Sequence, residues 1–229
     1  MWLVRSLAPV EPRIVLDVGA NVGSWGEMVL DALPSATVHS FEPIESTFRQ
    51  LEVNAARSTR WSAHRIALTA TGGADLPMWM AGHSTLASAV AGSGDGTPTH
   101  TVPASTGDQF CLDHKIDHID LLKVDTEGHD LAVLQGFSEM FGRGAIDLVQ
   151  FEFTLPAVFA RVQLRDFYDL LDPLGFRIGK LYPSWIDWRG YDAHDETYFR
   201  CNFVAVRQGA PVENELTLDR AVRSSRRPN

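Results

Sequence analysis

Residues 15–23 have the sequence VLDVGANVG. The apolar start of this segment, interrupted by Asp17, is typical of a strand buried on both faces, and we expect that strand at Ile14–Val18. The glycines that follow favour a tight turn whose backbone can approach a ligand closely. A helix is predicted from Ser24 to Leu33, where Pro34 ends it. A strand, a glycine turn and a helix in this order indicate a nucleotide-cofactor site in an open α/β sheet.

The same alternation continues along the chain. Further strands are predicted at Thr37–Phe41, Trp61–Leu68, Ile119–Val124, Ile146–Phe151, Phe176–Leu181 and Tyr198–Val206, and further helices at Ile44–Arg57, Asp130–Gln135 and Arg161–Leu171. Strands that alternate with helices predict an α/β fold, with a mainly parallel sheet and helices on both faces. We expect one domain over residues 1–229, with its core at about 14–206.

Two segments depart from this pattern. Residues 71–107 are rich in Gly, Ser and Thr, and we expect a β-hairpin or loop excursion over one end of the sheet, with strand-like pieces at Leu76–Met80 and Thr99–Val102. The basic tail, about residues 217–229, is predicted to be a frayed, solvated end.

Composition narrows the class of protein. The formal net charge of −9 disfavours a nucleic-acid partner. Two isolated cysteines argue against a disulfide framework or a cysteine-based zinc site. Residues 1–9 lack the apolar core of a signal peptide, and no run approaches the ~20 apolar residues that span a bilayer. We therefore expect a soluble cytoplasmic protein with no membrane partner.

The identity of the cofactor depends on the glycine turn. A dinucleotide fingerprint needs Gly-x-Gly-x-x-Gly, but Asn21 and Ser24 occupy its second and third glycine positions. The Asp17 carboxylate would also repel a pyrophosphate, whereas it would attract the ammonium and sulfonium of S-adenosylmethionine. Glu42 ends the next strand, where a carboxylate can accept hydrogen bonds from ribose hydroxyls. NAD proteins share that last feature, and both acids can also cap helices.

These residues resemble the FkbM-type methyltransferase family. The similarity rests on residues 15–23, on Phe41-Glu42-Pro43, on the segment KVDTEG at 123–128, and on a closing strand at 202–206. The resemblance implies a Rossmann-like class I methyltransferase sheet with seven strands in the order 3-2-1-4-5-7-6, strand seven antiparallel. It also implies methyl transfer from S-adenosylmethionine to a hydroxyl of a sugar, polyketide or other secondary metabolite. An NAD(P)-dependent oxidoreductase and a catalytically silent S-adenosylmethionine-binding module are the alternatives.

The resemblance also implies a set of cofactor-binding residues. The methionine portion falls at Asp17, Gly19, Asn21 and Gly23, the ribose at Glu42, and the adenine at Ile66 and Ala67. The predicted set also includes Ala20, Pro43 and Asp125. The 71–107 excursion lies where members of the family vary most.

Several acidic residues and one histidine are candidates for the chemistry. An alcohol is a poor nucleophile at neutral pH, so a base or a metal should help to remove its proton. In one hypothesis the base is Asp125 or His129, and the helix dipole would keep His129 neutral. In a second, less favoured one, Asp125, Glu127 and Glu152 hold a divalent cation such as magnesium. In a third, Glu127 and Lys123 are structural and the site acts by positioning.

The segment 182–191 is unusually aromatic for a loop. Trp185, Trp188 and Tyr191 would suit stacking on the small-molecule acceptor, and His83, together with Ser84, is a further candidate contact. The alternatives for the segment are an apolar cover of the sheet edge or a contact in a homo-oligomer.

Overall fold

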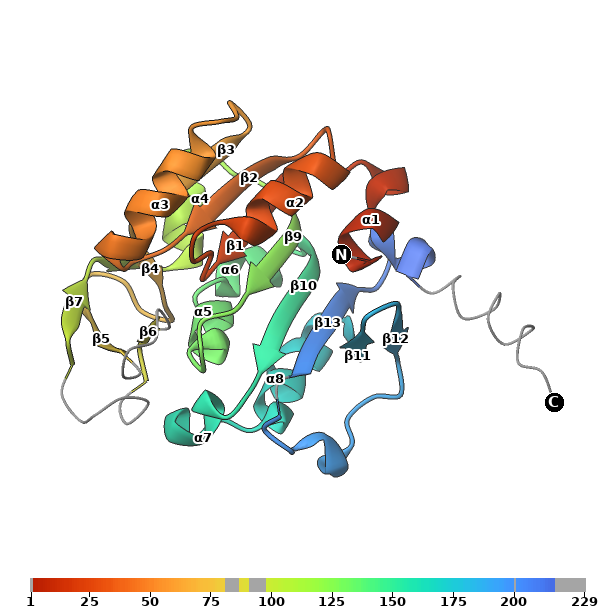
Figure 1. Cartoon of the computed structure of the whole chain (residues 1–229). Helices are drawn as coiled ribbons and strands as arrows, with labels where there is room; N and C mark the ends of the chain where they lie inside the picture. The colour runs from red at the N-terminus through yellow and green to blue at the C-terminus, as the bar shows by residue number, and fades with distance from the viewer. Residues whose placement is uncertain (1, 81–86, 91–97, 200, 217–229) are drawn as a thin grey trace.

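The computed structural model describes residues 2–80, 87–90, 98–199 and 201–216. An eight-stranded sheet forms its centre (Figure 1). Its strands, in spatial order, are β12 (Trp185–Asp187), β11 (Phe176–Tyr182), β13 (Cys201–Arg207), β10 (Ile146–Phe153), β9 (Ile119–Val124), β1 (Ile14–Val18), β2 (Thr37–Phe41) and β3 (Trp61–His64).

The sheet confirms the predicted topology and adds one strand to it. Strands β3, β2, β1, β9 and β10 pair in parallel, whereas β13 runs antiparallel to both β10 and β11. This is the order 3-2-1-4-5-7-6 with strand seven antiparallel. The prediction of seven strands was one short, because β12 folds back onto β11 through a two-residue loop. Trp185 pairs with Tyr182 in that hairpin, and their rings stack 4.4 Å apart.

Helices cover both faces of the sheet (Figure 1). One face packs against α1 (Trp2–Ser6), α2 (Ser24–Ala32) and α3 (Glu45–Ala55). The other packs against α4 (Gly107–His114), α5 (Asp130–Gln135), α6 (Ser138–Gly142) and α8 (Leu164–Leu171). Each face has its own buried apolar cluster, as expected for a sheet whose strands alternate apolar side chains between two helix layers.

Several predicted boundaries were wrong for local reasons. The strand predicted at Trp61–Leu68 divides into β3 and a two-residue β4 (Ala67–Leu68), which leaves the main sheet to pair with β8 (Ala104–Ser105). The helix predicted from Arg161 begins at Leu164, because Arg161 adopts a left-handed φ of 57° that ends a short helix, α7 (Pro156–Ala160). Three short 3-10 helices complete the connections: η1 (Ala8–Val10), η2 (Asp172–Leu174) and η3 (Ala193–Asp195).

The predicted excursion is a small sheet beside the carboxyl end of the main one (Figure 1). Its strand β5 (Leu76–Met80) pairs antiparallel with β7 (His100–Val102) and with β6 (Ala87–Ser88). Met78 and Val102 bury a small apolar cluster against Ile44 and Ala67. His83 and Ser84, and the tail from 217, lie outside the described residues.

Within the described part of the chain, no helix combines the length and the apolar character needed to cross a bilayer.

Candidate functional site

A cavity of about 130 Å³, partly open to solvent, lies where strands β1, β2 and β9 end. Parallel strands of an open α/β sheet bind ligands at this carboxyl edge. Its lining residues are Val18, Gly19, Asn21, Phe41, Glu42, Pro43, Ile66, Ala67, Leu68, Leu76, Met78, Ala89, Asp125, Thr126, Glu127 and His129. The structure therefore gathers most of the predicted cofactor residues around one space.

The turn after β1 is shaped by close packing. Gly19 has a φ of +79°, and a Cβ there would lie 1.9 Å from the carbonyl oxygen of Asp125. Gly23 also has a positive φ, of +91°, and packs against Leu51 and the ring of Trp61. Gly23 donates a backbone hydrogen bond to Ala20 at 2.9 Å, and neither residue lines the cavity, whereas Gly19 and Asn21 line it.

Glu42 faces the cavity at the end of β2. Its carboxylate is nearly buried and accepts backbone hydrogen bonds from Asn21, at 3.1 Å, and from Ile44, at 2.9 Å. Burial raises the pKa of Glu42, and the two backbone bonds oppose that rise. Each carboxylate oxygen has two acceptor sites, so the group retains capacity for further donors.

Asp17 is placed differently from the prediction. Its side chain is fully buried, is not part of the cavity lining, and accepts a hydrogen bond from Lys123 Nζ at 3.1 Å. Lys123 Nζ also lies 3.4 Å from the Asp125 carboxylate. Burial raises the pKa of Asp17; burial alone would lower the pKa of Lys123, but the two carboxylates outweigh that effect and raise it. The charge of Asp17 is therefore matched inside the protein.

The turn after β9 forms another side of the cavity. Asp125, Thr126, Glu127 and His129 all line it. His129 is the N-cap residue of α5, and its Nε2 lies 2.9 Å from the hydroxyl of Thr69. Burial lowers the pKa of His129 to about 4. This histidine is neutral at pH 7, but its low pKa makes it a weak base.

Three carboxylates meet at this edge of the sheet. Asp125, Glu127 and Glu152 each offer an oxygen, and these oxygens all lie within 4.8 Å of one another. This proximity is what the sequence-based hypothesis of a cation held by Asp125, Glu127 and Glu152 requires. Oxygen donors at such spacing suit a hard cation such as magnesium, although close carboxylates also occur without a metal.

Several residues of the site were not predicted. Leu76, Met78 and Ala89 bring the excursion to the cavity, and Ser88 donates a hydrogen bond to the carbonyl oxygen of Glu127 at 2.7 Å. A stretch rich in Gly, Ser and Thr carries no periodic signal that would have indicated these contacts.

The predicted acceptor residues of the aromatic segment lie elsewhere. Trp185, 42% exposed, stacks on Tyr182 at the sheet edge, and Trp188 is buried in the apolar cluster beneath α1 and α2. Tyr191 packs against Tyr168 and donates a hydrogen bond to Glu196. None of the three lines the cavity.

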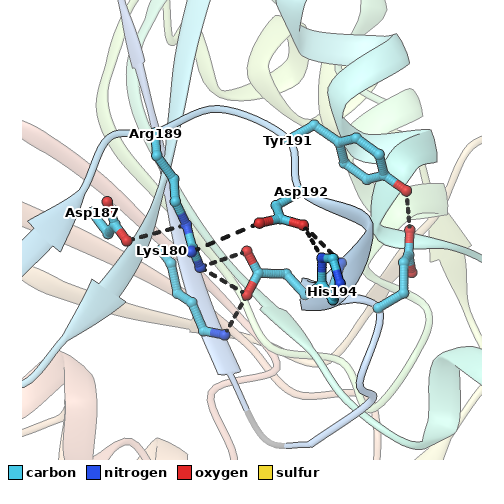
Figure 2. A network of polar contacts seen from close by, with 8 residues as sticks. Lys180, Asp187, Arg189, Tyr191, Asp192 and His194 are labelled. Carbon is cyan, nitrogen blue, oxygen red and sulfur yellow. Dashed lines mark hydrogen bonds and ion pairs between the residues drawn. The ribbon is translucent and has the colours of Figure 1, made fainter.

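The polar residues around this segment are paired with one another (Figure 2). Asp195 accepts hydrogen bonds from Lys180, at 2.8 Å, and from Arg189, at 3.0 Å. Arg189 also forms an ion pair with Asp187 at 3.1 Å. These contacts fasten the segment that follows β12 to β11.

Solved structures share this arrangement of elements. They include the fibrillarin pre-rRNA processing protein of Methanococcus jannaschii (12% sequence identity, covering 87% of this chain and 68% of that chain), the methyltransferase domain of bacterial CtHen1-C (13%, 90% and 94%) and cofactor-bound Rv0187 from MTB (12%, 89% and 77%), each with a TM-score of 0.50. At these identities the similarity shows the fold alone, and the fold is that of the class I methyltransferases.

The family follows from the sequence. A family model described as the methyltransferase FkbM domain matches residues 17–178, which is more than half of the chain. The chain belongs to the FkbM methyltransferase family, and the cofactor that this family implies is S-adenosylmethionine. No curated protein matches the chain by sequence.

Proposed function

We propose that the cavity binds S-adenosylmethionine and that the enzyme methylates a hydroxyl oxygen of a small molecule, such as a sugar, a polyketide or another secondary metabolite. The observation that carries the proposal is the cavity lining, which combines Glu42 from β2 with the turns after β1 and β9. Glu42 has acceptor capacity for ribose hydroxyls. Ile66 and Leu68 offer apolar surface to an adenine ring, and Asp125 and Glu127 offer negative charge to a cationic ligand end.

The bound cofactor would supply an electrophilic methyl group. The chain would hold the acceptor oxygen against that group, and positioning of this kind provides much of the acceleration. Asp125 accepts the proton of the hydroxyl in this proposal, since Asp125 lines the cavity at the end of β9. His129 is the second candidate base: burial lowers its pKa to about 4, close to that of an ordinary carboxyl group, and its Nε2 already contacts the hydroxyl of Thr69.

Ligand binding tests the cofactor assignment directly. We expect S-adenosylmethionine and S-adenosylhomocysteine to raise the melting temperature, since a ligand at 100 times its Kd stabilises by about 2.7 kcal/mol. Glu42→Ala should remove most of the shift. Glu45→Gln is the matched control, because Glu45 is a surface acid paired with Arg49 and Arg65. A shift with NAD or NADP, and none with the sulfonium pair, would contradict the proposal.

A cation held by Asp125, Glu127 and Glu152 is the second candidate for activating the hydroxyl. The observation that favours it is their mutual approach within 4.8 Å, a spacing at which three carboxylate oxygens can share one hard cation. Turnover that is unchanged after treatment with EDTA would exclude it.

A further inference from the structure

The carboxylate of Asp130 makes contacts that neither the family resemblance nor the proposed chemistry uses. Asp130 is the first residue of α5 and is 2% exposed. Its Oδ2 accepts hydrogen bonds from the backbone of Thr126 at 3.3 Å, from the Thr126 hydroxyl at 3.0 Å and from the backbone of Gly128 at 3.3 Å. Its Oδ1 accepts one from the backbone of Glu152 at 3.3 Å. One side chain thus connects the turn after β9 with the end of β10.

The turn needs such a connection. Glu127 and Gly128 both have left-handed backbone angles, with φ of 52° and 96°. A non-glycine residue in this region costs free energy, so the surrounding contacts must hold it there. Gly128 also packs so closely on Pro156 that a Cβ would lie 2.8 Å from it. The turn is therefore wedged between Asp130 on one side and the residues that follow β10 on the other.

The turn carries the acidic side chains of the site. Asp125 and Glu127 line the cavity from the turn, and Glu152 reaches them from β10. The spacing of these carboxylates depends on how the ends of the two strands sit relative to each other. Asp130 accepts hydrogen bonds from the turn after β9 and from the end of β10.

We propose that Asp130 is a positioning residue, which sets the Thr126–Gly128 turn against the end of β10 and thereby shapes the side of the cavity formed by Asp125, Glu127 and His129. This role goes beyond the proposed function, although one arm of its test uses the ligand that the proposed function names. Asp130 does not line the cavity itself, so it would act through these neighbours.

The chain contains a carboxylate with similar contacts elsewhere. Asp108 accepts backbone hydrogen bonds from Glu139, at 2.8 Å, and from Met140, at 3.0 Å, and one from the Ser138 hydroxyl at 3.3 Å. These contacts hold the start of α6, and Asp108 does not line the cavity. A purely structural role would make Asp130 and Asp108 equivalent.

The experiment compares Asp130→Asn with Asp108→Asn in the full chain. An amide retains one acceptor oxygen and places an NH₂ group against N–H donors, so both variants should melt at a lower temperature than the wild type. We expect only Asp130→Asn to weaken the binding of S-adenosylhomocysteine, at least tenfold in Kd by titration calorimetry. Equal Kd values for both variants and the wild type would overturn the proposal.

A second pair of variants covers the case in which Asp130→Asn fails to fold. Asp130→Glu keeps the carboxylate but displaces it by one methylene group and should weaken S-adenosylhomocysteine binding, whereas Asp108→Glu, the same change away from the cavity, should leave it unchanged. Equal binding by this pair would overturn the role assigned to the network.

A readout without ligand separates this proposal from the proposed function. Amide hydrogen exchange at Thr126 and Gly128 should accelerate in Asp130→Asn and remain unchanged in Asp108→Asn. If the wild type does not bind S-adenosylhomocysteine, the proposed function fails and exchange alone decides the role of Asp130. Unchanged exchange in Asp130→Asn would overturn that role.

Discussion

Asp17 and Lys123 lie opposite each other on β1 and β9, paired in register and both buried. An ion pair inside a sheet is costly to break from one side, because the remaining charge stays in a medium of low dielectric constant. Asp125 shares the same ammonium, so Lys123 serves one carboxylate in the core and one at the cavity.

We therefore expect Lys123→Met to destabilise the protein by about 3–5 kcal/mol, since it leaves Asp17 buried and unpaired. The double variant Asp17→Asn/Lys123→Met removes that charge and should recover part of the loss. Urea unfolding at pH 7 measures both effects. A double variant no more stable than Lys123→Met would show that the unpaired charge is not the cause.

At the residue scale, the sequence indicated which residues belong to the site better than it indicated the role of each residue. The motif around Asp17 predicted a cofactor site, and the cavity is there. The same motif did not indicate that Lys123, on β9, would pair with the Asp17 carboxylate. Such pairing depends on the register between two strands that are more than 100 residues apart, and no local pattern encodes it.

At the scale of elements, the turn between β1 and α2 is wedged against the end of β9. Gly19→Ala should lower stability by several kcal/mol and abolish S-adenosylhomocysteine binding, because the methyl group would overlap the Asp125 carbonyl oxygen. Gly73 is the matched control: it has a φ of +93° and nothing within 4 Å of an added Cβ.

Gly73→Ala should therefore lower the free energy of unfolding by about 1–2 kcal/mol, which is the cost of placing a non-glycine residue at a positive φ. Thermal unfolding and calorimetric titration of the two variants test the difference. Equal losses would mean that the approach of Gly19 to β9 has no influence on the turn.

The elements that sequence reasoning missed have weak or ambiguous signals. Helix α4 follows the Gly- and Ser-rich excursion, yet Thr106 caps it by accepting a hydrogen bond from the backbone of Gln109. A Thr followed three residues later by Gln is a capping-box pattern and could have revealed this helix. Strand β12 has three residues, too few to show a period.

At the scale of the whole molecule, we expect buried histidines to lower the free energy of unfolding at acidic pH. The Nδ1 of His39 and the Nε2 of His64 lie 3.1 Å apart, and one of them must accept the hydrogen bond that the other donates, so the two rings cannot both be charged. Burial, with the neighbouring His114, lowers the pKa of His39 to about 4, and burial, with His39, does the same for His64.

Because these pKa values are lowered in the folded state, the unfolded chain binds more protons between about pH 6.5 and pH 4. Stability is present above pH 6.5 and is lost as the pH falls through this window, by at most about 1.4 kcal/mol per pH unit for each histidine. The raised pKa values of Asp17 and Glu42 act in the opposite direction, so a variant is needed to isolate the histidines.

His64→Gln should make the decline in unfolding free energy shallower than in the wild type. Urea titrations from pH 7 to pH 4 give both curves. Parallel curves would exclude a contribution from this pair.

The topology of the whole sheet was the most predictable feature. The alternation of strands and helices predicted a mainly parallel α/β sheet, and the resemblance to the FkbM-type family implied its strand order. The excursion was predictable as an interruption of the pattern, but its contribution to the cavity was not. Leu76, Met78 and Ala89 reach the cavity through antiparallel pairings and a small apolar cluster, which are tertiary contacts.

The way in which the excursion joins the domain has a consequence for how such enzymes diversify. Ala67 and Ala104 pair side by side, and Thr69 donates a backbone hydrogen bond to Ser105, so the chain leaves and returns at the same point. A segment with adjacent ends can be lengthened, shortened or exchanged at little cost in loop-closure entropy and without shifting a strand of the main sheet. Segments of different length and sequence can therefore replace the excursion at this junction. Each would contribute different residues to the cavity, while the main sheet stays the same.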